Sequence, residues 1–317
     1  MVQFAKIVWA IDPSDDPERL MRSLRMLEYI VQVVHSVIHP VYVVSVAGSS
    51  EGKQEVGGRN QSDFSRDRKS TVDLFKDISL KNLRPPRIIQ ASSNQTHHIT
   101  DALLNYAVGI RADLLIVNTR GGKGLAQFFR GSFINRLLLR SSIPVLALGP
   151  YVTEVRPCDR ILYATHLDPV SKSDFRYAVE IASSFRSELT IFHALSRRQR
   201  DQDSDSSTAV GEPLPECSHL MRRARAWSKW ASKKGVSTDV VFEDISSEIT
   251  EQILRLAEEQ HAGMILLESR SGIFQSFIKS SKVRTIIRRS RCPVLVRRPL
   301  KKESLSQVSH GKEQKAA

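Results

Sequence analysis

The sequence predicts an α/β protein made of two tandem doubly wound domains, each built on a five-stranded parallel sheet. A length of 317 residues favours two domains of ordinary size. Short apolar runs alternate with stretches whose apolar residues recur at helical spacing, which is typical of parallel strands covered by helices on both faces. An internal repeat between residues 112–147 and 262–296 then fixes the number of domains.

Each copy of this repeat holds an apolar strand, a loop, a helix and a last strand that begins with Pro-Val-Leu. The copies are 150 residues apart at their start, Ala112 and Ala262, and 149 apart at Pro144 and Pro293. One residue is therefore missing from the second copy, and the deletion falls between its two strands. We therefore predict two halves whose order of elements is the same.

The predicted domains cover residues 1–150 and 157–300, and we expect a disordered basic and polar tail over 301–317. Besides the two strands of the repeat, strands are expected at 4–11, 41–46 and 87–90 in the first half and at 160–165, 189–194 and 238–243 in the second. Apolar residues at helical spacing predict helices around 20–34, 99–104 and 133–139, and around 175–182 and 249–254. A further helix precedes the third strand of each half, after polar inserts, 48–62 and 197–214, that we expect to be mobile loops.

Composition excludes several classes of protein. No apolar run reaches the roughly 18 residues that a membrane helix needs, and the N-terminus has the pattern of a strand with an internal charge, not of a signal peptide. Three cysteines, Cys158, Cys217 and Cys292, stand at unrelated spacings. They favour a reducing compartment and no metal site. We therefore expect a cytoplasmic protein without a membrane span.

The net charge of +13 is concentrated in residues 279–302, which include many basic residues and no acidic one. Such a segment can bind nucleic acid or an anionic membrane. We favour a solvated helix face followed by a basic tail, because no aromatic residues that would stack on bases are interleaved with the charges.

The chemistry is expected at the carboxyl ends of the strands, where doubly wound sheets bind their ligands. In the first half, a glycine-rich loop follows the fourth strand and ends at Gly131-Ser132, before an apolar helix. Glycines let backbone amides approach a phosphate, and the helix start adds N–H groups and a favourable dipole. A plain connecting turn stays open as the alternative, since neither a dinucleotide fingerprint nor a P-loop is complete. The loop's glycines and basic residues are Gly121, Gly122, Gly124, Arg120, Lys123 and Arg130.

This layout resembles the universal stress protein (UspA) family in its tandem two-domain form, which implies an adenine nucleotide alpha hydrolase-like fold. Nucleotide-binding members of that family carry Gly-x2-Gly-x9-Gly-Ser/Thr after the fourth strand. Gly121, nine further residues and Gly131-Ser132 match the second glycine and the closing pair. Asn118 stands in place of the first glycine, and asparagine tolerates a positive φ better than most residues. The resemblance covers roughly residues 1–300.

The resemblance implies that the first half binds ATP or another adenine nucleotide, with Mg²⁺ only as its companion. Asp12, at the end of the first strand, would accept hydrogen bonds from the ribose; the alternative role is a helix cap, which Asp15 or Asp16 can fill equally well. Val46 would line the adenine, unless it is an ordinary core valine. The implied binding residues are Ala10, Ile11, Asp12, Val46, Asn118, Arg120, Gly121, Gly131, Ser132 and Phe133.

The second half departs from the pattern at the same points. His166 replaces the aspartate, and Glu268 stands where the first glycine would be. Ser271 and Ser280 replace the other two glycines. Glu268 and Glu243 would also bring negative charge toward phosphates. We predict that this half is a degenerate partner of the first.

We expect binding rather than catalysis, because His166 and Asp168 lack an accompanying nucleophile or metal cluster; slow ATP hydrolysis stays open. The resemblance implies that the last strands, 143–148 and 292–297, pair inside the chain as an intramolecular pseudo-dimer. A homodimer and an unknown protein partner also stay open. Two alternatives compete with nucleotide binding: a nucleotide-independent interaction protein, and a basic adaptor for nucleic acid or an anionic surface, of which nucleic acid binding is the least favoured.

Overall fold

A computed structural model describes residues 4–13, 15–45, 75, 78–93, 95–119, 131–169, 171–195, 215–244, 248–268 and 281–297. The predictions for the two polar inserts, the second helix of the first half, the glycine-rich loop 120–130 and the tail concern residues outside these ranges. The described chain separates into two compact units. The N-terminal domain holds residues 4–155 with 287–293, and the C-terminal domain holds 156–286 with 294–297.

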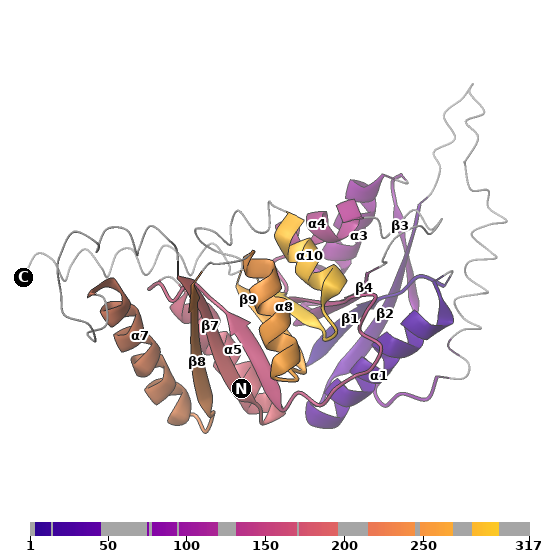
Figure 1. The fold of residues 1–317 in the computed structure, drawn as a ribbon. Coiled ribbons are helices and arrows are strands. Elements are labelled where there is room, and N and C mark those ends of the chain that lie inside the picture. Colours follow the sequence, from indigo (N-terminus) through magenta and orange to yellow (C-terminus); the bar gives the residue numbers. More distant parts are fainter. Residues whose placement is uncertain are drawn as a thin grey trace, which may run out of the picture. The chain divides into compact units, whose positions relative to one another are not determined.

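The N-terminal domain is a five-stranded parallel sheet flanked by helices (Figure 1). Its strands lie in the order β3-β2-β1-β4-β5, so the strand order reverses between β1 and β4. This reversal is the switch point at which doubly wound sheets hold ligands. The elements are β1 (Lys6–Ala10), α1 (Pro17–Val33), β2 (Val37–Ser45), β3 (Arg87–Ala91), α3 (Thr96–Gly109), β4 (Leu114–Asn118), α4 (Gly131–Arg140) and β5 (Val145–Leu148).

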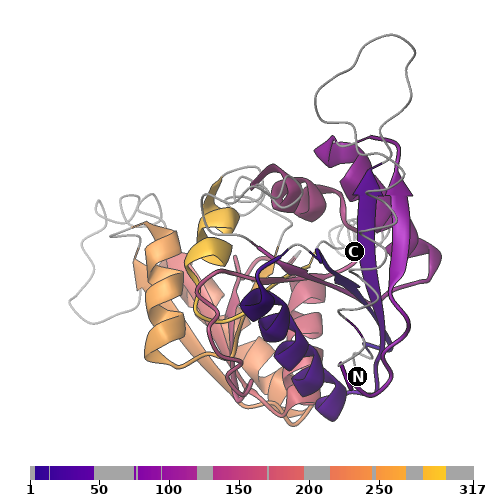
Figure 2. The same cartoon turned by 90° about the vertical axis from the view of Figure 1, so that its right-hand side faces the viewer.

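The C-terminal domain repeats this plan with the strand order β8-β7-β6-β9-β10. Two of its helices, α8 and α10, are drawn in orange and yellow in Figure 2. The predicted fold class, a tandem pair of five-stranded parallel sheets, is confirmed. The helix expected before the third strand of this half is α7. The elements are β6 (Arg160–Ala164), α5 (Lys172–Phe185), β7 (Glu188–Leu195), α7 (Pro215–Ser232), β8 (Thr238–Asp244), α8 (Ile249–Glu259), β9 (Met264–Glu268), α10 (Ser281–Arg289) and β10 (Val294–Arg297).

The central strands are apolar because helices cover both of their faces. Every residue of β4 and β9 is buried, as expected for inner parallel strands. Helix α1 begins where Asp16 accepts a hydrogen bond from the Glu18 N–H at 3.0 Å, with Pro17 at the first helical position. Local sequence therefore starts the helix, and the apolar face of the helix holds it on the sheet.

Gly263 marks a close approach of two segments in the C-terminal domain. A Cβ at this position would lie 2.3 Å from the Pro157 carbonyl oxygen and 2.7 Å from the Cys158 Cα. The equivalent residue in the first copy of the repeat is Asp113, whose carboxylate accepts a hydrogen bond from the Lys6 N–H at 2.9 Å. In both domains the backbone N–H of this position donates to the first strand, from Asp113 to the Lys6 carbonyl oxygen at 2.8 Å and from Gly263 to the Arg160 carbonyl oxygen at 2.9 Å. Asp113 adds a side-chain hydrogen bond to this link, and Gly263 adds close backbone packing.

Replacing Gly263 by alanine is expected to destabilise the C-terminal domain by about 1–3 kcal/mol, because the backbone at Pro157 and Cys158 must move. Gly109→Ala is the control, since an added Cβ there meets no atom within 4 Å. Urea unfolding followed by circular dichroism compares the two variants. Equal midpoints would contradict the close packing at Gly263.

Candidate functional site

The predicted ligand-binding edge of the N-terminal domain lies where β1 and β4 end. Ala10 pairs with Val117, so the residues that follow these two strands are neighbours. Ala10, Ile11 and Asp12 are all buried there. The structure therefore brings Asp12 and Asn118, the two polar residues predicted from separate motifs, to the same end of the sheet.

Asp12 is not the cap of the helix that follows it. Asp16 fills that role, because its side chain accepts the hydrogen bond from the Glu18 N–H. The backbone carbonyl of Asp12 accepts a hydrogen bond from the Asp15 N–H at 2.9 Å, which turns the chain toward the helix. Of the two roles considered for Asp12, the helix cap is thus excluded.

Asn118 is bound to helix α1. Its Nδ2 donates to the Arg19 carbonyl oxygen and to the Ser23 Oγ, each at 3.1 Å. Trp9 Nε1 donates to the same Ser23 Oγ at 3.1 Å, and that hydroxyl donates to the Leu20 carbonyl oxygen at 2.9 Å. This buried group ties α1 to β1 and β4.

Asn118 does not use the positive φ that an asparagine tolerates. The residue is the last of strand β4 and does not have a positive φ. It therefore does not replace a glycine by adopting a left-handed backbone. Its side chain holds a helix instead, which is a role that a glycine cannot fill.

Both ends of the glycine-rich loop start from fixed elements. Thr119 donates from its backbone N–H to the Leu148 carbonyl oxygen at 2.8 Å, and its Oγ1 donates to the same oxygen at 3.3 Å. At the other end α4 begins at Gly131 and has no acidic residue in its first turn. Such a helix start is suited to binding an anion.

The structure describes only some of the remaining residues that were predicted to bind the nucleotide. Phe133 is 2% exposed, so its side chain belongs to the core. Gly131 and Ser132 are placed by their backbone in α4. Val46, Arg120 and Gly121 lie outside the described residues.

Glu268 occupies the position in the C-terminal domain that Asn118 occupies in the N-terminal domain. It ends β9, as Asn118 ends β4, and it is 1% exposed. Ser171 Oγ donates to its Oε1 at 2.5 Å, while Thr165 Oγ1 and Tyr163 OH donate to its Oε2 at 2.6 and 2.9 Å. Three hydroxyl groups thus surround a buried carboxyl group.

This environment changes the acidity of the carboxyl group. Burial raises the pKa of Glu268 to about 7, although the three hydroxyl groups stabilise the charged form and oppose that shift. The oxygens of Glu268 are directed to the end of β6 and to the start of α5. That its charge opposes a phosphate at this edge stays a prediction. Glu243 is likewise engaged, with Arg255 at 2.6 Å.

Asp168, which the sequence suggested as an acid–base partner of His166, has a structural role. Asp168 Oδ1 accepts a hydrogen bond from the backbone N–H of Ser171 at 2.7 Å, and it lies 2.7 Å from the Ser171 Oγ, whose single proton is shared between Asp168 and Glu268. The carboxylate therefore stabilises the turn that leads into α5. His166 lies 6.5 Å, between ring centroids, from His193, whose pKa is lowered by burial.

Arg297, from the basic segment, is turned into the C-terminal domain. Its Nη1 donates to Asp174 Oδ1 at 2.9 Å and to the Ser173 carbonyl oxygen at 3.1 Å. Its guanidinium group also lies 4.7 Å from the ring centroid of Tyr177. Residues 279–302 therefore do not form a uniform outward-facing basic surface.

Within the described ranges, no three His, Cys, Asp or Glu side chains gather in a way that could hold a metal ion. In the same part of the chain, every helix is too short or too polar to cross a membrane. Cys158 and Cys292 are buried, and neither forms a disulfide within the described residues.

The sequence prediction missed the hydroxyl partners of Glu268. Thr165 and Ser171 are ordinary residues in the sequence, and only their placement around one carboxyl group gives them a role. A detectable signal was the repeat itself, since it aligns Asn118 with Glu268 and so marks a polar residue at the end of both fourth strands. That signal predicts a shared position but not its partners.

A model of the universal stress protein family matches the chain twice, at residues 3–149 and 157–298. A solved universal stress protein from Archaeoglobus fulgidus DSM 4304 is 17% identical, with a TM-score of 0.64 over 95% of this chain and 98% of its own. A functionally unknown protein from Pseudomonas aeruginosa PAO1 is 17% identical, with a TM-score of 0.59 over 98% of both chains. At these identities the likeness shows the fold alone. No curated protein sequence matches the chain significantly.

The raised pKa of Glu268 predicts a pH-dependent stability. Because the folded state favours the protonated carboxyl, the stabilisation is fully present below about pH 4.5, the pKa of an ordinary glutamate, and is lost as pH rises through about 7. The contribution of Glu268 to the free energy of unfolding should therefore fall over this window, by on the order of 3 kcal/mol.

Glu268→Gln is expected to remove most of that slope, since the amide is neutral throughout. Glu259→Gln is the control, because Glu259 is exposed on α8 and its removal should leave the slope intact. Denaturant unfolding at several pH values measures both. A slope that is unchanged in Glu268→Gln would show that another group controls the pH dependence.

Proposed function

The chain belongs to the universal stress protein family, and from that premise we propose that its N-terminal domain binds ATP or another adenine nucleotide in a cytoplasmic stress response. The C-terminal domain acts as a degenerate partner without a nucleotide of its own. Binding, rather than turnover, is the proposed activity, and Mg²⁺ enters only with the nucleotide.

The observation that carries the proposal is the meeting of three features at one end of the N-terminal sheet. Asp12 is buried beside the strand ends. Thr119 anchors the start of the glycine-rich loop to β5, and Gly131 begins α4 at its end. A carboxylate suited to ribose hydroxyls and a helix start suited to phosphates thus flank the same loop.

The neutral side chain at the end of β4 also favours an anion at this edge. The Asn118 side chain donates from Nδ2 to α1 and carries no charge. In the C-terminal domain the same position holds Glu268, which would oppose a nearby phosphate whenever it is ionised. The C-terminal loop also lacks the matching glycines, so we propose one nucleotide per chain.

Binding can act as a signal if the nucleotide stabilises one conformation of the loop and a partner protein recognises that conformation. The partner is unknown. The family resemblance further implies an intramolecular pseudo-dimer through the last strands, 143–148 and 292–297; this pairing stays a prediction, as does a homodimer.

One observation favours the nucleotide-independent alternative. Asn118 has a structural partner on α1, so its presence in place of a glycine needs no ligand to explain it. The adaptor alternative is weakened by Arg297, which is used inside the domain. A direct measurement of ATP binding distinguishes the nucleotide-binding protein from the nucleotide-independent interaction protein.

Calorimetric titration with ATP is expected to give binding to the wild-type chain and at least about tenfold weaker binding to Gly131→Glu, because a carboxylate at the start of α4 repels the phosphates. The substitution should not unfold the domain, since an acidic residue is favourable in the first turn of a helix.

Ser280→Glu is the matched control, as Ser280 is the repeat equivalent of Gly131 in the degenerate half. Its ATP affinity should equal that of the wild type. Absence of binding at millimolar ATP would leave the interaction-protein alternative, and a loss caused by Ser280→Glu would show that the C-terminal site is active.

A further inference from the structure

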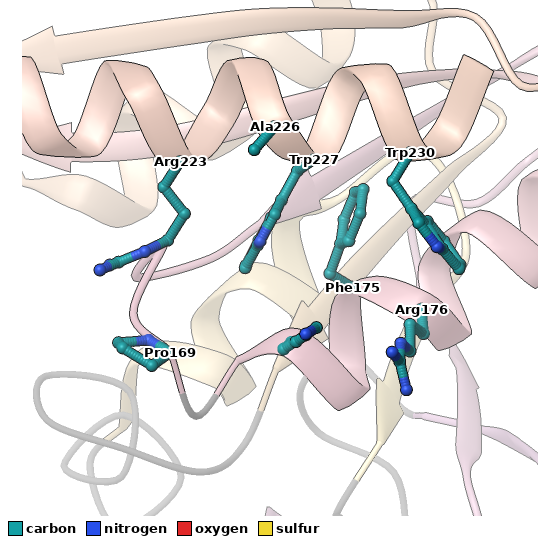
Figure 3. Close-up of a pocket in the computed structure, with 8 residues that line it drawn as sticks. Pro169, Phe175, Arg176, Arg223, Ala226, Trp227 and Trp230 are labelled. Carbon is teal, nitrogen blue, oxygen red and sulfur yellow. The ribbon is translucent and has the colours of Figure 1, made fainter. Parts of the chain in front are cut away.

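A cavity of about 370 Å³ lies in the C-terminal domain between α5 and α7. This volume falls in the range of small-ligand sites. Figure 3 shows side chains of α7 projecting toward Phe175 of α5 and toward Pro169, with the ring of Phe175 between those of Trp227 and Trp230. The lining residues are Pro169, Lys172, Phe175, Arg176, Arg223, Ala226, Trp227 and Trp230.

One wall of the cavity is aromatic and already in place. Phe175 and Trp227 stack with their ring centroids 4.4 Å apart and an interplanar angle of 15°. Both are buried, at 2% and 7% exposure, so the packing of the core fixes them. Trp230 lies 5.8 Å from Phe175 and is half-buried, which leaves part of its ring accessible. A flat apolar ligand can contact this wall with little rearrangement.

The rest of the lining is cationic. Lys172, Arg176 and Arg223 contribute three positive charges, and the lining includes no acidic side chain. Within the described residues, none of the three forms an ion pair with a carboxylate. The nearby acidic groups are engaged elsewhere: Asp174 with Arg297, and Asp168 with Ser171.

The cations are held at the cavity by local contacts. Arg223 donates from Nη1 to the Leu167 carbonyl oxygen, in the turn before α5. The Arg176 guanidinium lies 5.9 Å from the Trp230 ring centroid, which keeps the charge close to the accessible aromatic face. A guanidinium group has five N–H donors, so each arginine retains donors for a ligand.

From this combination we infer that the C-terminal domain carries a second binding site, for a small planar aromatic anion such as an aromatic carboxylate. The rings contact the flat face of the ligand, and Lys172, Arg176 and Arg223 bind its negative group. The site is built from the helices that follow β6 and β7 and uses none of the residues proposed for the nucleotide. It is therefore independent of the proposed function.

The test uses the full chain labelled with 5-fluorotryptophan and 2-naphthoate as the probe. The chain has three tryptophans, and Trp9 is fully buried in the N-terminal domain, where it serves as an internal control. Fluorine NMR is expected to show shifts for Trp227 and Trp230 on titration and none for Trp9. Single Trp→Phe variants assign the three signals.

Two matched ligands test the chemistry of the site. 2-Naphthamide keeps the rings without the charge, and octanoate keeps the carboxylate without the rings. Each should bind at least about tenfold more weakly than 2-naphthoate. Equal affinity for the amide would overturn the role of the cations, and equal affinity for octanoate would overturn the role of the aromatic wall.

Two variants test whether a cation of the cavity lining binds the carboxylate of 2-naphthoate. Lys172→Met should weaken 2-naphthoate binding several-fold without unfolding the domain, because Lys172 is exposed. Arg225→Met is the control: Arg225 is also exposed and lies on α7, but does not line the cavity. Equal losses in the two variants, a shift of Trp9 alone, or no shift at millimolar 2-naphthoate would each overturn the proposal.

Discussion

In each domain, one polar side chain at the end of the fourth strand fixes the start of the first helix at the ligand-binding edge of the sheet. In the N-terminal domain, Asn118 donates to a backbone carbonyl and a serine hydroxyl of α1. In the C-terminal domain, Glu268 accepts from hydroxyl groups on β6 and at the start of α5. Because the first helix begins beside the strand ends, the residue that fixes it also determines the charge next to any ligand there.

The two domains solve the same packing problem with different electrostatics. The N-terminal edge carries a neutral amide and is the edge at which we propose that an anion binds, whereas the C-terminal edge carries a buried carboxyl group whose pKa is raised to about 7. The C-terminal domain places its cations elsewhere, beside two tryptophans between α5 and α7. A duplicated fold has therefore acquired two different local chemistries, which is expected when sites vary more freely than the scaffold.

The architecture could be predicted from sequence because it depends on local pattern. The buried runs of β4 and β9 and the repeat at an offset of 150 residues needed no knowledge of distant contacts. The role of Asn118 could not be predicted, since its partner Ser23 is 95 residues away and a motif comparison treats the position only as a missing glycine. The aromatic cavity between α5 and α7 could not be predicted from the sequence for a similar reason. Arg223, Trp227 and Trp230 share one face of a helix, but their meeting with Phe175 depends on how α5 and α7 cross.

The central claim is that the domains share a fold but that only the N-terminal one has an edge suited to an adenine nucleotide. The number of nucleotides bound per chain tests this claim most directly. Native mass spectrometry of the full chain at saturating ATP should show one nucleotide per chain, and the count should stay at one as the concentration rises further. Two nucleotides per chain would contradict the proposed effect of Glu268 on the C-terminal edge. A chain that binds none would contradict the N-terminal site itself.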